Sequence, residues 1–190
     1  MSLGHPGFAD PVADSQACFR AVLDAMARPG WVQAVSTPHD PPPGLDRSTA
    51  AVLLTLVDAE TPLWLDDAAE PASAWVRFHC GAPPAAPDAA DFGLALGPVS
   101  FAPFAAGTDD APERGATLIL QVEALGRGMP LRLSGPGLAA AAGLAVAGLP
   151  DGFFAEWAAN HALFPRGIDI ILCAGDRLAA LPRTVRIEAG

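Results

Sequence analysis

The sequence predicts an α/β fold with a layered, mixed sheet, because short apolar strand patterns alternate with amphipathic helix patterns along most of the chain. The C-terminal part shows this most clearly. Residues Ile168–Cys173 are mostly β-branched and apolar, and the run is too short for a helix, so it predicts a strand buried on both faces. Gly175 and Asp176 supply a turn, and Arg177–Leu181 returns as a second strand until Pro182 interrupts its hydrogen bonding. We therefore expect an antiparallel pair at this end of the sheet.

Two helices and two strands are predicted in the first third of the chain. Apolar residues at helical spacing end near Ala27, and either Asp14 or Ser15 is suited to cap the start of this helix. A second helix is expected from a cap at Ser48 to Val57, although the apolar run 52–57 alone also fits a buried strand. The other expected segments are the strands Trp31–Val35 and Thr61–Leu65 and the proline-rich loop Thr37–Gly44.

The rest of the chain is predicted to contain two further helices, a central strand and weaker strands. Thr117–Val122 is expected in the centre of the sheet, because its apolar run suits a strand covered on both faces, and Leu131–Leu133 is expected at an edge. The span Leu133–Pro150 is uncharged but too weakly apolar and too interrupted to cross a membrane. The remaining expected segments are the helices Ala72–Cys80 and Asp151–His161, the strand Phe92–Leu96, a short helix within Ser100–Ala106 and the loop Gly107–Gly115.

Length and charge limit the class of protein. A chain of 190 residues suits one domain, residues 1–190, which can bury a full core without a disulfide or a metal. The net charge of −10 argues against a nucleic-acid partner, and the N-terminus lacks the basic head and apolar core of a signal peptide. A cytoplasmic protein is therefore expected. All eleven basic residues are arginine, so the side chains offer no amine for a Schiff base.

Cysteine and histidine form no recognisable catalytic or metal-binding motif. The three cysteines lack C-x-x-C spacing, so we expect free, buried thiols in a reducing compartment. Cys80 directly follows His79, but neighbours on a helix diverge by about 100° and rarely face each other. A hydrolase that uses Cys80 is therefore the last of our hypotheses. None of the four histidines shows metal-ligand spacing, so no metal site is predicted.

Arginines at the ends of predicted elements are better candidates for a ligand site. Each of Arg77, Arg166 and Arg183 can hold a phosphate or carboxylate through two hydrogen bonds, or can form a salt bridge with one of the 21 acidic residues. Glu113 suits a base or ligand group, but it also suits a solvated loop. One hypothesis is thus a cleft that binds a phosphonate or nucleotide and is lined by Arg77, His79, Glu113 and Arg183.

Motifs spread over nearly the whole chain resemble one protein family. They begin with FRAVLDAMARPG at Phe19–Gly30, continue with LLTLVDAETPLWL, RFHCGAP, APERGATLILQV and LSGPG, and end with FPRGIDIILCAGDRLAALPRT at Phe164–Thr184. Single pieces such as LSGPG are unspecific. The ordered set, however, resembles PhnH, the H-subunit family of the bacterial phosphonate carbon–phosphorus lyase system. The proline loop near Pro41 and the Ala-rich segment Leu138–Leu149 carry none of the resemblance.

The resemblance implies a fold and a role. The fold would be a three-layer α/β/α sandwich with a mixed sheet, similar to a reduced pyridoxal-phosphate-dependent transferase but without the cofactor. The family further implies a homodimer in isolation and assembly with the G, I and J subunits of the lyase core. With the G, I and L components, the H subunit is linked to the transfer of alkylphosphonate to the ribose C1 of ATP. That step releases adenine and yields ribose 1-phosphonate 5-triphosphate.

No catalytic residue comes with the resemblance, so an accessory, non-catalytic subunit without a cofactor is the expected role. Its apolar surface would contact other subunits, with Phe101, Phe104 and Trp157 as expected contributors. The alternative is a stand-alone protein that binds an anion or nucleotide, or a small enzyme, that uses the arginine, histidine and glutamate cleft.

Overall fold

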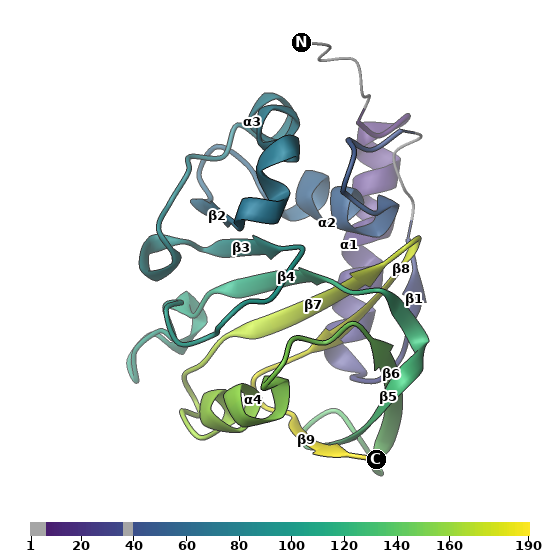
Figure 1. The fold of residues 1–190 in the computed structure, drawn as a ribbon, viewed down its shortest axis with the longest axis vertical. Helices are drawn as coiled ribbons and strands as arrows, with labels where there is room; N and C mark the ends of the chain where they lie inside the picture. The colour runs from purple at the N-terminus through teal and green to yellow at the C-terminus, as the bar shows by residue number, and fades with distance from the viewer. Residues whose placement is uncertain (1–6, 36–39) are drawn as a thin grey trace.

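The computed structural model describes residues 7–35 and 40–190, which form a mixed α/β fold with two sheets (Figure 1). The larger sheet has six strands in the order β1-β8-β7-β4-β3-β2. Strands β2, β3, β4 and β7 are parallel, while β8 and β1 continue the sheet antiparallel. The expected mixed sheet and C-terminal antiparallel pair are thus confirmed. The strands are β1 (Gln33–Ala34), β2 (Leu63–Leu65), β3 (Phe92–Ala95), β4 (Thr117–Gln121), β7 (Asp169–Ala174) and β8 (Arg177–Leu181).

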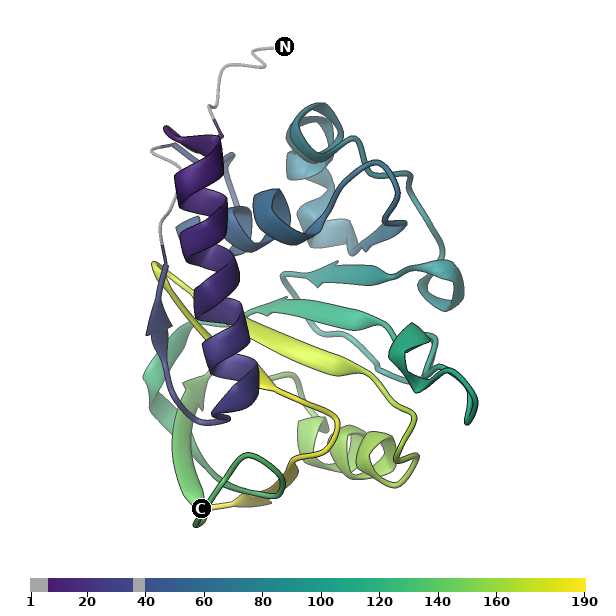
Figure 2. The ribbon, with the colours of Figure 1, turned by 180° about the vertical axis from the view of Figure 1, so that it is seen from behind.

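Three helices cover one face of this sheet, as Figure 2 shows most clearly for the first of them. They are α1 (Pro11–Ala27), α2 (Arg47–Leu56) and α3 (Ser73–Cys80). Alternate residues of the central strands point toward them: Ile119 and Ile171 join the helix-side core with Leu53 and Trp75. Their neighbours Leu118 and Ile170 face the opposite side and are equally buried. The two-sided burial explains why these strands are continuously apolar in the sequence.

The opposite face is covered mainly by a second, antiparallel sheet with the order β6-β5-β9, together with one helix (Figure 1). These elements are β5 (Ala124–Ser134), β6 (Ala142–Ala147), β9 (Arg186–Ala189) and α4 (Phe153–His161). This layer differs from the α/β/α expectation, in which helices lie on both faces. Phe101, Phe104 and Trp157, which we expected at the surface, are instead buried in this second core.

Several predicted boundaries also need correction. Helix α1 starts earlier than expected, because the carboxylate of Asp10 caps it by accepting a hydrogen bond from Ala13 N at 3.0 Å. The predicted helix Ser48–Val57 is confirmed as α2, which ends at Leu56, so the alternative strand over 52–57 is wrong, and Ser100–Ala106 forms no helix. Residues Leu131–Leu133 lie in the middle strand of the second sheet, not at an edge. Of the proline-rich loop, residues 37–39 lie outside the described residues.

Within the described ranges, every helix is too short or too polar to span a lipid bilayer.

Gly93 in β3 offers a test of the packing between the large sheet and its second core. A Cβ atom at this position would lie 2.7 Å from Phe104 Cε1 and 2.9 Å from Leu118 Cδ1. We expect Gly93→Ala to lower the free energy of unfolding by about 1–3 kcal/mol, because the core must shift to admit the methyl group. Urea denaturation followed by tryptophan fluorescence measures this difference.

The matched control is Gly143→Ala in strand β6, where a Cβ atom meets nothing within 4 Å. This change should raise the free energy of unfolding by roughly 0.5 kcal/mol, because alanine loses less backbone entropy than glycine on folding. Equal effects of the two substitutions would contradict the close contact described at Gly93.

Candidate functional site

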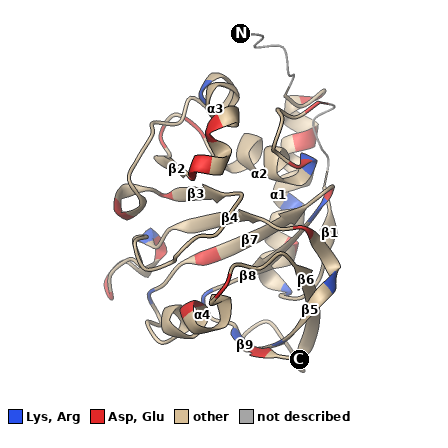
Figure 3. Cartoon of the chain, in the orientation of Figure 1, with Lys and Arg blue, Asp and Glu red and all other residues tan. Residues whose placement is uncertain are grey.

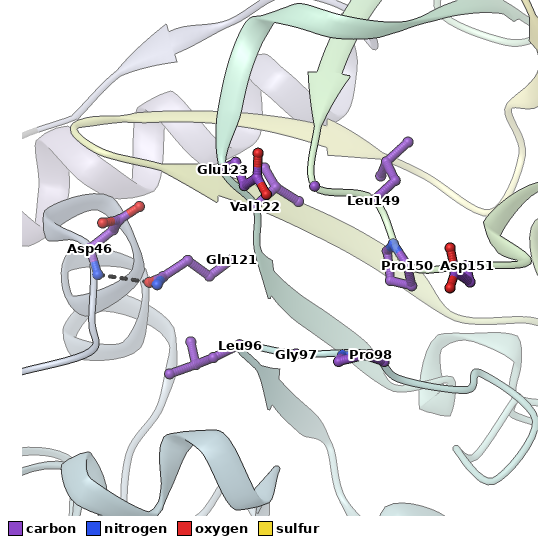
Figure 4. A pocket seen from close by; sticks show the side chains of 11 residues that line it. Asp46, Leu96, Gly97, Pro98, Gln121, Val122, Glu123, Leu149, Pro150 and Asp151 are labelled. Carbon is purple, nitrogen blue, oxygen red and sulfur yellow. Dashed lines mark hydrogen bonds between the residues drawn. The ribbon is translucent and has the colours of Figure 1, made fainter.

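A cavity of about 490 Å³ lies at the carboxyl ends of parallel strands β3 and β4, which is where ligands usually bind in open α/β sheets (Figure 4). We call it the carboxyl-edge cavity. Figure 4 shows Asp46 and Gln121 on one side of the opening and Leu149, Pro150 and Asp151 on the other. It is lined by Asp46, Leu96, Gly97, Pro98, Gln121, Val122, Glu123, Gly148, Leu149, Pro150 and Asp151.

Gln121, the last residue of β4, fixes one wall of the carboxyl-edge cavity. Its Oε1 accepts hydrogen bonds from Asp46 N and Thr49 Oγ1, both at 2.7 Å, and its Nε2 donates to Gly44 O at 2.9 Å. Asp46 in turn accepts a hydrogen bond from Gly175 N at 2.7 Å. The start of α2 is thereby tied to two strand ends of the large sheet.

Asp66, directly after β2, fixes the wall that follows β3. Its Oδ2 accepts hydrogen bonds from Leu96 N at 2.7 Å and Gly97 N at 2.9 Å, while Oδ1 accepts one from Ala69 N at 2.8 Å. A single carboxylate thus satisfies three backbone donors and holds the strand ends β2 and β3 together. This cavity wall is positioned by hydrogen bonds rather than by apolar packing alone.

The charge of the carboxyl-edge cavity decides which ligands suit it. Its lining includes the carboxylates of Asp46, Glu123 and Asp151 and no arginine or histidine. Carboxylates repel phosphate and phosphonate groups, whereas they accept hydrogen bonds from hydroxyl and amine groups. The cavity is therefore unsuited to the anion that the sequence-based hypothesis placed among arginines.

Arg183 does not line this cavity. It lies at the opposite, amino edge of the sheet, in a mostly buried ion pair with Asp169, the first residue of β7. The guanidinium bonds the carboxylate through Nε at 3.1 and 3.2 Å and through Nη2 at 2.5 Å, and Nη1 donates to Pro112 O. The side chains are 12% and 15% exposed. Its hydrogen-bonding groups thus already have partners within the chain.

The other three candidate residues lie apart from one another. Glu113 is exposed in a short 3₁₀ turn (Pro112–Arg114), next to the carbonyl that Arg183 bonds. Arg77 is exposed on α3 and lines a smaller cavity of about 250 Å³, the Arg77 cavity, beside β2. The ring of His79 packs against Trp75, with ring centroids 4.8 Å apart.

The structure therefore brings Glu113 near Arg183, whereas Arg77 and His79 are two positions apart on α3 and point in different directions, and His79 does not line the Arg77 cavity. Strands β7 and β2 are three strand positions apart in the large sheet, which corresponds to roughly 14 Å. Among the described residues, no cavity that we report is lined by both Arg77 and Arg183. Arg166, the third arginine considered, forms an ion pair with Asp109 at 3.1 Å.

Sequence reasoning missed the residues that build the carboxyl-edge cavity. The available signal was position: Gln121 is the last residue but one of the predicted strand Thr117–Val122, and Asp66 directly follows the predicted strand Thr61–Leu65. Polar side chains at the carboxyl ends of parallel strands share one edge of the sheet. Glu123 directly follows the predicted strand Thr117–Val122 and carried the same signal, whereas Asp151 carried none, because the sequence placed it at the start of a helix.

The cysteines offer no nucleophile. Cys80 is buried and its thiol contacts Leu53 O at 3.7 Å; burial, with a smaller effect from Asp58, raises its pKa to about 12. Burial likewise raises the pKa of Cys173 to about 12. At neutral pH both thiols are therefore protonated and unreactive. In the part of the chain that the structure describes, no group of three or more His, Cys, Asp or Glu residues is arranged to hold a metal ion.

Comparison with known proteins places the chain in a family. The family model described as "Bacterial phosphonate metabolism protein (PhnH)" matches residues 6–188. The chain belongs to the PhnH family. A Rhizobium meliloti (strain 1021) relative named "Alpha-D-ribose 1-methylphosphonate 5-triphosphate synthase subunit PhnH" is 44% identical over 187 residues, which cover 95% of this chain and 94% of the relative. A Stutzerimonas stutzeri relative named "Putative C-P lyase subunit protein HtxG" is 34% identical over 174 residues, or 91% and 85% of the two chains.

The buried ion pair predicts a stability effect that separates a structural from a ligand-binding role of Arg183. We expect Arg183→Ala to lower the free energy of unfolding by about 3–5 kcal/mol, because it leaves the carboxylate of Asp169 buried without its partner. The exposed Arg77→Ala is the control and should change this free energy by less than about 0.5 kcal/mol. An Arg183→Ala protein of unchanged stability in urea denaturation would refute the structural role.

The raised thiol pKa values predict slow thiol chemistry. In the folded protein, Cys18, Cys80 and Cys173 should fail to react with Ellman's reagent at pH 8 within minutes, because burial raises the pKa of all three thiols. For Cys80 and Cys173, with a pKa of about 12, only about one part in 10⁴ is thiolate. All three should react after unfolding in guanidinium chloride. An added surface thiol, Ala139→Cys, is the positive control for accessibility. Rapid native labelling of Cys80 would revive the hydrolase hypothesis.

Proposed function

We propose that this chain is an accessory subunit of the phosphonate carbon–phosphorus lyase core, required for the use of organic phosphonates. The observation that supports this most is family membership over residues 6–188, together with a 44% identical relative named as a subunit of a ribose 1-methylphosphonate 5-triphosphate synthase. With G, I and L components, the assembled enzyme would transfer alkylphosphonate to the ribose C1 of ATP and release adenine.

The chemistry of the described residues supports an accessory rather than a catalytic role. The reaction handles a triphosphate and a phosphonate, which require cationic partners. Arg183 is occupied by Asp169, and the carboxyl-edge cavity is lined by carboxylates. The thiol of Cys80 is protonated at neutral pH. The catalytic groups would therefore belong to other subunits.

The partners and setting form part of the same proposal. The chain would assemble with the G, I and J subunits in the cytoplasm and would form a homodimer in isolation. Its resemblance to a reduced pyridoxal-phosphate-dependent transferase is supported by the mixed sheet with helices packed on it. Without a lysine, such a fold cannot hold pyridoxal phosphate as an internal aldimine.

A second candidate function is anion binding in the Arg77 cavity beside β2. Arg77 is exposed there, and the lining of this space of about 250 Å³ also includes Ser73, whose hydroxyl donates to the carboxylate of Glu70 at 3.2 Å. An anion would therefore rely on the guanidinium of Arg77. His79, which does not line this cavity, would serve a separate position, as would Glu113 and Arg183. Phosphonate-dependent growth should fall in Arg77→Ala if this anion site is used, and should persist if the role is purely accessory.

Assembly is the direct test of the accessory role. We expect the chain to co-elute with G, I and J subunits of the same system after co-expression and size-exclusion chromatography, because its family members carry subunit names. Deletion should abolish growth on methylphosphonate as the sole phosphorus source, and growth on inorganic phosphate is the control. A chain that stays apart while the G, I and J subunits assemble normally would refute the proposal.

A further inference from the structure

The Arg77 cavity is lined by both signs of charge. Its lining includes the guanidinium of Arg77 and the carboxylate of Glu70, and both side chains are exposed. In the described part of the chain, neither of them takes part in an ion pair within 4.0 Å. Figure 3 shows basic and acidic positions together at this end of the molecule, around α3. The cavity therefore holds a cation and an anion that do not neutralise each other.

The local sequence places these two charges on one side of a helical segment. Glu70 lies in the 3₁₀ helix Asp67–Ala72, which continues directly into α3. Glu70, Ser73 and Arg77 are spaced by three and four residues, so they lie on the same side of this segment. Ser73 Oγ donates to Glu70 Oε1 at 3.2 Å, which steadies the carboxylate and leaves its Oε2 open to a ligand.

The edge of β2 adds uncharged hydrogen-bonding groups to the same cavity. Leu63 bonds outward from the sheet, because its N–H donates to Pro83 O at 2.9 Å and its carbonyl accepts from Ala85 N at 3.0 Å. Backbone groups alternate along a strand, so the N–H and carbonyl of Leu65, which also lines the cavity, face the same way. Pro87 has no N–H with which to continue this pairing. Among the described residues, neither group of Leu65 has a partner on this side.

The rest of the lining is apolar, and the space is small. Val76, Ala82 and Pro84 contribute aliphatic surface between the polar groups. The volume of about 250 Å³ is below the roughly 300–1,000 Å³ that is usual for drug-sized ligands. The cavity therefore suits a short aliphatic molecule with polar groups at its ends.

We propose that the Arg77 cavity binds a small zwitterion, in which a short aliphatic chain joins an ammonium group to an acid group. The acid group accepts hydrogen bonds from Arg77 and from the N–H of Leu65, while the ammonium group donates to Glu70 and to the carbonyl of Leu65. This inference rests on the second candidate function, anion binding in this cavity, and adds the chemical class of the ligand. Amino acids and aminoalkylphosphonates share this chemistry.

Electrostatics favours a zwitterion over a simple ion. A simple anion meets the carboxylate of Glu70 as well as the field of a chain with a net charge of −10. A simple cation meets the guanidinium of Arg77. A zwitterion has no net charge and gives each of the two side chains an opposite partner. Of the four cavities that we report for the described residues, this is the one whose lining includes a basic residue.

Isothermal titration calorimetry with the full chain tests the ligand class. The zwitterions are 2-aminoethylphosphonate and β-alanine, and the matched simple ions are ethylphosphonate, propionate and ethylamine. We expect at least one zwitterion to bind about tenfold or more tightly than each of its simple analogues, because each analogue lacks one charged hydrogen-bonding group. Comparing the two zwitterions identifies the acid group: binding of the phosphonate alone assigns a phosphonate, and binding of both assigns amino acids in general.

Substitutions that remove one charge locate the site. Arg77→Gln and Glu70→Gln should each weaken binding of the zwitterion by about tenfold or more. For ethylphosphonate the two should act in opposite directions: Arg77→Gln weakens its binding, whereas Glu70→Gln strengthens it by removing a repulsive charge. Arg127→Gln and Glu188→Gln are the matched controls, since these exposed residues lie in the second sheet and outside the cavity. Both controls should leave binding unchanged, and circular dichroism should be the same for all four variants.

Three results would overturn the inference: no binding of either zwitterion, binding that both cavity variants leave intact, or ethylphosphonate that binds as tightly as the zwitterions. The last of these would remove the zwitterionic class and keep anion binding at Arg77. Co-elution with the other lyase subunits reports separately on the accessory role. Zwitterion binding without co-elution would refute only the lyase-core role, and co-elution without zwitterion binding would refute only the present inference.

Discussion

The buried ion pair between Arg183 and Asp169 is the constraint on which the arrangement of the amino edge depends. It joins the segment after β8 to the first residue of β7, and its further bond to Pro112 O fixes the turn before β4. The site admits no side chain at Gly115, where a Cβ atom would lie 2.6 Å from Arg183 Nη1. Two buried charges are tolerated because each is satisfied by several hydrogen bonds. Because the guanidinium of Arg183 is already hydrogen-bonded within the chain, it is not available to bind a ligand.

The carboxyl-edge cavity and a cavity of about 560 Å³ beside α4, the α4 cavity, differ in chemistry. The carboxyl-edge cavity has a polar framework, in which Gln121 and Asp66 hold backbone groups and acidic residues line the space. The α4 cavity has an apolar floor and small apolar side chains at its rim. The first suits hydroxyl or amine groups and the second suits an apolar side chain. Neither lining contains a basic residue, so neither is built for a phosphonate or a triphosphate.

The sequence predicted the large sheet well and the second sheet poorly, for a physical reason. Strands such as β4 and β7 are buried on both faces, so their apolar runs are continuous and easily recognised. Strand β6 reads AGLAVA and forms from small residues with weak strand preference, and β5 contains Gly126, Gly128 and a register shift before Met129. Hydrogen bonding of β5 to β6 and β9 overrides these local preferences. The prediction of the candidate site failed for a similar reason. Arg183 pairs with Asp169, fourteen residues earlier in the chain, and sequence spacing alone does not reveal this pair.

The distribution of charge supports the proposed accessory role, in which other subunits bind the anionic substrates. Transfer of a phosphonate to a nucleotide needs cationic groups in a site that excludes water. In this chain Arg183 neutralises an internal carboxylate, while Arg28 and Arg166 are paired with nearby acids. What the fold presents outward is an uncharged apolar face on α4, which gains most from contact with another folded surface. Such a surface favours a role in assembly, in which catalytic groups on neighbouring subunits carry out the chemistry.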